Sequence, residues 1–197
     1  KQAGLDLTGH GGALSQMEEA YMSRWAEKIP GVGASSRAYQ TFLNKLRADS
    51  FDAMVRGLGR NGNMTPAELK AVANYVNVAT GRGAGKSHPK AMVGLNTLFF
   101  SPRFLASRFQ LLIGQPMYKG SWRTRKAIAV EYGRFLAGLG VVYALASLAF
   151  KAAGDDDEEV RIGYDPRSSD FGKIIIGKTR LDPLAGLAQL TVFAART

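Results

Sequence analysis

The sequence predicts a mainly α-helical protein: a multi-helix assembly with one long central apolar helix and a small C-terminal β-hairpin. Three observations lead to this class. Apolar side chains recur at helical spacing along most of the chain, and capping residues, proline and glycine separate the repeats. An uncharged run covers residues 135–150. An isoleucine-rich stretch at 173–181 contains a Gly-Lys pair, a sequence typical of a two-residue hairpin turn.

The elements follow in order from their start and stop signals. Ser15 and Glu18 have the spacing of a capping box, so a first helix is expected from Ser15 to the Pro-Gly pair at 30–31. Thr65, Pro66 and Glu68 give a second capping box with proline at the first helical position. Apolar spacing and breakers place the remaining helices at about 36–57, 66–80, 89–100, 102–113, 121–154 and 183–195.

These elements divide the chain into four parts. A flexible glycine-rich lead is followed by a basic helical region, by the long helix with its apolar run, and by an acidic linker with the hairpin and the last helix. The parts cover residues 1–14, 15–120, 121–154 and 155–197.

The excess of basic over acidic residues is confined to the middle of the chain. The 197 residues carry a formal net charge of +10. Residues 31–134 hold 16 basic and four acidic side chains, a net of +12, whereas residues 135–150 hold none of either sign. Such asymmetry points to nucleic acid or an anionic membrane as partner.

The residue types needed for most catalytic centres are missing or wrongly spaced. The chain has no Cys and two His, which excludes thiol chemistry, disulfides and cysteine-ligated metals. The loop before Lys86-Ser87 resembles a phosphate loop, but Thr80 occupies the position, five residues before Gly85, where the first glycine is required. The acidic residues at 18, 19 and 27 are explained by a cap and a solvated face, and those at 155–159 lack the pattern of a calcium loop. We therefore expect no enzyme, no cofactor and no metal.

The uncharged run has two interpretations, and both stay open. Sixteen residues span about 24 Å as a helix, slightly short of a bilayer core unless the flanking Lys151 and alanines are added. The alternative is a core helix of a bundle, apolar on every side. The residues expected to contact lipid or another helix are Phe135, Gly140, Ala144, Leu145, Leu148 and Phe150.

The basic block is too one-sided for an ordinary solvated surface, and it predicts contacts with a phosphate backbone. Such contacts do not depend on base sequence and weaken with salt. The residues expected to make them are Arg82, Lys86, Lys90, Arg103, Arg108, Lys119, Arg123, Arg125 and Lys126.

Five stretches together resemble a C-terminal module of the very large polyvalent proteins of tailed bacteriophages. They are residues 42–51 (FLNKLRADSF), 77–83 (NVATGRG), 100–109 (FSPRFLASRF), 165–173 (DPRSSDFGK) and 179–183 (TRLDP). The resemblance covers roughly residues 36–185, most of the chain.

The resemblance implies a non-enzymatic internal virion protein, or ejection protein, that is carried in the capsid and enters the host with the genome. Such a protein is expected to form a homo-oligomer near the portal and tail axis, beside portal, tail or other ejection proteins. There it helps to form a conduit for double-stranded DNA across the host membrane. Its expected location is the virion interior and then the host cell envelope. The alternative is a virion-internal scaffold or DNA-packing protein without a membrane role.

Overall fold

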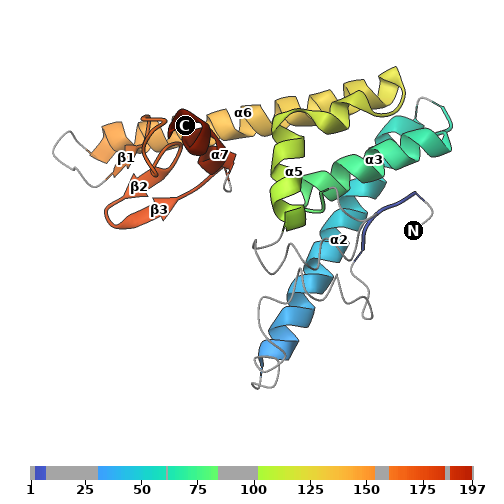
Figure 1. The fold of residues 1–197 in the computed structure, drawn as a ribbon, viewed down its shortest axis with the longest axis horizontal. Helices are drawn as coiled ribbons and strands as arrows, with labels where there is room; N and C mark the ends of the chain where they lie inside the picture. The colour runs from blue at the N-terminus through green and yellow to red at the C-terminus, as the bar shows by residue number, and fades with distance from the viewer. Residues whose placement is uncertain are drawn as a thin grey trace. The chain divides into compact units, whose positions relative to one another are not determined.

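The structure is a computed structural model that describes residues 3–7, 31–60, 62–83, 102–153, 160–184 and 187–196. It confirms the mainly helical class, the long apolar helix and the C-terminal hairpin (Figure 1). The chain divides into two compact units, Lys1–Ala129 (unit 1) and Val130–Thr197 (unit 2). The boundary lies inside the long helix α6 (Trp122–Ala153), so each unit contains part of it.

The described residues of unit 1 form three further helices and a short 3₁₀ turn. Helix α2 (Val32–Gly59) begins before its predicted start at Ser36, and α3 (Pro66–Ala79) begins at the predicted capping box. Helix α5 (Pro102–Leu112) ends at the predicted glycine break, where η2 (Gln115–Tyr118) follows. The helices expected at 15–29 and 89–100 lie outside the described residues.

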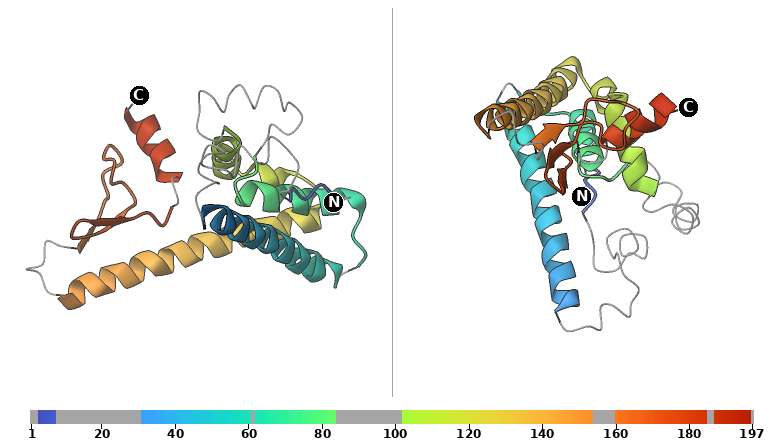
Figure 2. Two further views of the ribbon diagram at one scale, coloured as in Figure 1. Left: turned by 90° about the horizontal axis from the view of Figure 1, so that it is seen from below. Right: turned by 90° about the vertical axis from the view of Figure 1, so that its left-hand side faces the viewer.

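The core of unit 1 forms where α3 packs against the C-terminal half of α2. Leu58, Val72 and Val76 are buried there, and Phe51 and Met54 pack against them. The N-terminal half of α2 extends away from α3 (Figure 2). Its apolar residues Tyr39 and Phe42 follow the helical spacing of a core-facing side, yet both are exposed, at 56% and 63%. Helical spacing identifies an apolar face but cannot say whether a partner covers it.

Helix α3 is also the surface on which the first described residues lie. The backbone N–H of Asp6 donates to Asn77 Oδ1 at 2.8 Å, and Asn77 Nδ2 donates to the Gly4 carbonyl at 3.0 Å. After α3 the chain runs close to α5, where a Cβ added to Gly83 would lie 2.4 Å from the backbone N of Ser107. Only glycine permits that approach.

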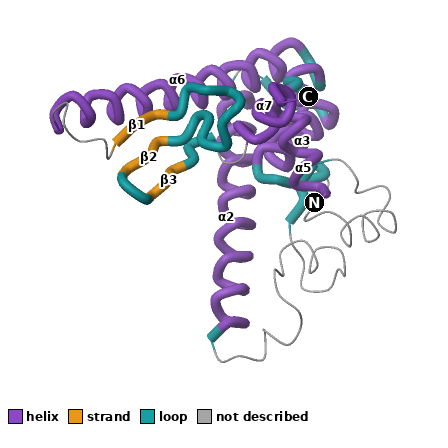
Figure 3. Tube along the Cα trace, turned by 60° about the vertical axis from the view of Figure 1, so that its left-hand side comes forward, coloured by secondary structure: helices purple, strands orange, loops and turns teal. Residues whose placement is uncertain are grey.

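Unit 2 contains a three-stranded antiparallel sheet and helix α7 (Leu187–Arg196) (Figure 3). The predicted hairpin is confirmed as β2 (Ile174–Ile176) and β3 (Thr179–Leu181). Strand β1 (Val160–Ile162) pairs with β2 and has no counterpart among the predicted elements. The buried apolar residues of unit 2 come from β2 and α7, namely Ile174, Ile175, Ala188 and Val192.

Candidate functional site

A buried carboxylate joins the first turn of α3 to the first turn of α6. Glu68 Oε1 accepts a hydrogen bond from Ser121 Oγ at 2.6 Å, and Glu68 Oε2 accepts from the Thr65 backbone N–H at 2.8 Å. Oε2 also lies 3.0 Å from the Arg123 guanidinium. Chiefly through the Ser121 hydrogen bond, then Thr65 and Arg123, these contacts lower the pKa of Glu68 from 4.5 to about 2. The ionised carboxylate therefore fixes the start of α6 on α3.

The loop before α6 is held equally close to α3. Gly120 has φ +82°, and a Cβ added to it would lie 2.8 Å from the Cβ of Ala71. Glycine is therefore required here both for backbone conformation and for space. As a result, Lys119 and the first turn of α6 are placed beside the exposed side of α3.

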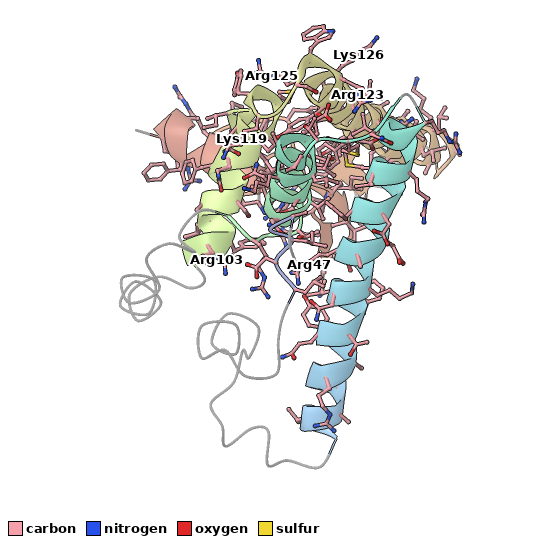
Figure 4. The ribbon with its side chains drawn as sticks, turned by 90° about the vertical axis from the view of Figure 1, so that its right-hand side faces the viewer. Arg47, Arg103, Lys119, Arg123, Arg125 and Lys126 are labelled. Carbon is pink, nitrogen blue, oxygen red and sulfur yellow. The ribbon has the colours of Figure 1, made fainter. Side chains whose placement is uncertain are left out.

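Four exposed cations lie on the elements that these contacts join, and we call them the basic corner: Lys70 of α3, Lys119 of the loop, and Arg125 and Lys126 of α6. None of the four has a carboxylate partner among the described residues. Arg125 Nε donates to the Gly120 carbonyl at 3.0 Å. In Figure 4 the labelled members lie at the top of the view with Arg123, above Arg47 and Arg103. The basic corner is thus a local excess of positive charge.

Two of the residues predicted to contact DNA have a different role in the structure. Arg82 and Arg103 are buried, with exposures of 5% and 4%. Arg103 lies 2.6 Å and Arg82 lies 3.8 Å from the Asp6 carboxylate. A guanidinium in this position cannot reach a phosphate outside the protein. The sequence pattern showed positive charge but not the distant aspartate, 97 residues before Arg103, that pairs with it.

The other predicted contacts differ in availability. Lys119, Arg125 and Lys126 are exposed, whereas Arg123 is half-buried on Glu68 and also donates to the Gly62 and Asn63 carbonyls. Arg108 is half-buried with its guanidinium 4.4 Å from the centre of the Phe104 ring. Lys86 and Lys90 lie outside the described residues. Lys70 was missed because no other basic residue lies near it in the sequence.

The apolar run of α6 is largely uncovered in the structure. Among the predicted lipid- or helix-contacting residues, Phe135, Leu145 and Leu148 are exposed at 49%, 61% and 62%, and Gly140 and Ala144 are exposed too. Phe150 is half-buried. Helix α6 is long enough to cross a bilayer, and an 18-residue window within it has a mean hydropathy of 1.7. Core helices of soluble proteins also pass this test.

A different side of the same helix packs on other residues of unit 2. The Tyr143 hydroxyl donates to the Gly172 carbonyl, in the turn before β2. A Cβ added to Gly172, whose φ is +72°, would lie 2.7 Å from Leu184 Cδ1 and 3.5 Å from the Tyr143 oxygen. Helix α6 therefore has one side that packs within unit 2 and an exposed apolar side, which we call the outer face and define by Phe135, Val141, Val142, Leu145 and Leu148.

Within the part of the chain that the structure describes, no group of three or more His, Asp or Glu side chains is placed to hold a metal ion. Comparisons with protein-family models, with curated proteins and with solved structures find no match for this chain.

Proposed function

We propose that this chain is a non-enzymatic DNA-associated module of a phage internal virion protein, or ejection protein. The basic corner contacts the phosphate backbone of double-stranded DNA, and the outer face of α6 packs in a homo-oligomer or against a membrane. In this role the module lies near the portal and tail axis, with other virion proteins, and helps to form the conduit for the genome. The family resemblance supplies the phage context, whereas the geometry supports the two contacts.

The observation that carries the proposal is the set of four cations in the basic corner, none of which has a carboxylate partner in the described part of the chain. The Glu68 carboxylate lies beside them but is already neutralised by Arg123 and buried. Because the Glu68 carboxylate is engaged in this internal contact, the positive charges of the basic corner stay available to an external anion. DNA presents such an anion as a continuous row of phosphates.

The DNA contact is tested by binding of the full chain to a short duplex over a range of salt. Four phosphates neutralised by the basic corner give a slope of log K against log salt of about −3.6. Affinity then falls by about 150-fold between roughly 50 and 200 mM salt. Binding that does not change with salt, or no binding, contradicts the proposal.

The membrane contact is tested by flotation with vesicles of anionic and neutral lipids. We expect Leu145→Lys to abolish flotation, since it places a charge on the outer face. The matched control is Leu181→Lys, because Leu181 is an exposed leucine of β3, at 47%, outside the outer face. Equal flotation of the two variants would contradict a membrane role for α6.

The second candidate function is a virion-internal scaffold or DNA-packing protein without a membrane role. The hydrogen bond from Tyr143 to Gly172 favours it. A helix that spans a bilayer must lose the bond from Tyr143 to the Gly172 carbonyl, whereas a helix that packs on protein retains it. Salt-dependent DNA binding together with no flotation of the wild-type chain supports this scaffold.

A further inference from the structure

An open groove lies on the exposed side of α3, between the first residues of the chain and the loop before α6. It has a volume of about 550 Å³. Its lining includes the small side chains of Ala67 and Ala71 together with Gly4 and Gly120. Lys70, Lys119 and Asn74 also line it.

The walls of this groove are fixed by contacts already described for unit 1. Asn77 holds the segment 3–7 through one donated and one accepted hydrogen bond. On the other side, Gly120 packs on Ala71, and Asn74 Nδ2 donates to Gln115 Oε1 at 3.2 Å. The groove is thus a formed feature of the fold, and a ligand need not create it.

The charge of the groove is unbalanced. Lys70 and Lys119 are exposed and, among the described residues, neither has a hydrogen-bond or ion-pair partner for its ammonium group. Among the residues that the structure describes, no acidic side chain lines the groove. Two cations in one concavity repel each other, and an anion between them removes that repulsion.

We infer that this groove binds a stretch of the DNA phosphodiester backbone, with Lys70 and Lys119 each neutralising one phosphate. The inference rests on the proposed function and locates its DNA contact. Lysine serves here as a point charge, which suits contacts independent of base sequence. The small side chains of Ala67 and Ala71 in the lining take up less of the space that a sugar between two phosphates needs than larger side chains would.

A phosphodiester fits the surroundings better than an acidic peptide does. Arg125 and Lys126 add two exposed cations on the first turns of α6, and Arg125 is bonded to Gly120 of the groove lining. Such an extended cationic surface matches a polymer that carries one charge at every repeat. A short acidic peptide would leave Arg125 and Lys126 without an anion.

The test compares two doubly substituted full-length chains. Lys70→Gln with Lys119→Gln removes both groove charges, and Lys151→Gln with Lys178→Gln removes the same charge from exposed lysines of unit 2. Fluorescence anisotropy with a labelled duplex gives the affinity of each at several salt concentrations. We expect the groove variant to lose about 1.8 units of salt slope, at about 0.9 per phosphate, and the control to retain the wild-type slope.

In fold-change, the salt-induced loss of affinity between roughly 50 and 200 mM becomes about 12-fold smaller in the groove variant. A wild-type chain that binds with strong salt dependence while the groove variant keeps its slope overturns the groove but leaves the proposed function intact. No wild-type binding overturns both. Displacement of the duplex by polyglutamate at the same charge concentration, in the wild type but not in the groove variant, would instead identify the groove as a site for acidic peptides.

Discussion

The first turns of α6 pack in unit 1. The substitution Ile128→Ala measures how much this packing contributes to the free energy of unfolding. Ile128 and its neighbour Thr124 both have 0% exposure. The substitution removes three buried carbon atoms, worth about 2.4 kcal/mol at about 0.8 kcal/mol each. The cavity left behind brings the expected loss in free energy of unfolding to roughly 3–4 kcal/mol.

The assay is urea denaturation followed by circular dichroism at neutral pH, with the midpoint and slope compared between variants. Two controls carry the same kind of truncation at exposed positions: Ile113→Ala in unit 1, with 65% exposure, and Leu145→Ala on the outer face, with 61%. Each should change stability by less than about 0.5 kcal/mol. Equal destabilisation by Ile128→Ala and Ile113→Ala would refute the assignment of this turn to the core of unit 1.

The remaining predictions concern the two buried carboxylates. The Glu68 pKa of about 2 lies below its ordinary value of 4.5, so its stabilisation is complete above pH 4.5 and is lost as pH falls toward 2. Glu68→Gln should remove this stabilisation at neutral pH and flatten the acid branch of a stability–pH profile. An unchanged profile would contradict the role of Glu68 in fixing the start of α6 on α3. Asp6→Asn leaves the buried Arg103 without its counter-charge and should cost about 3–5 kcal/mol by chemical denaturation. Asp49→Asn is the matched control because its ion pair with Lys45 is exposed, and a similar loss in both would show that Asp6 is not special.

Local signals predicted the elements of the fold well where the physical cause is local. The capping box at Thr65 begins α3, and the Gly177 turn joins β2 to β3, because those contacts involve residues close in sequence. Strand β1 was missed since it has three residues and its pairing partner begins at Ile174, beyond any local pattern. The same reason explains the exposed Tyr39, whose helical spacing is that of a core residue.

The candidate site was only partly predictable for a related reason. A count of basic residues treats every arginine as a surface charge. Arg103 is neutralised by Asp6, and Arg123 by Glu68, through pairings across long stretches of sequence. Lys70 could be added to the site only once the fold had brought α3 beside the loop that carries Lys119.

The two sides of α6 separate the two candidate functions, because one side is bonded to protein and the other exposes apolar side chains. The side of Tyr143 is bonded to Gly172 within unit 2, and the outer face exposes Leu145 and Leu148. Complete insertion in a bilayer exposes every side of the helix to lipid, so it costs the Tyr143 contact and leaves the Gly172 carbonyl to find another donor. Packing of the outer face on protein keeps that contact. Flotation of the wild-type chain is therefore the first experiment to perform, since a positive result supports a membrane contact of the outer face and a negative one favours the scaffold.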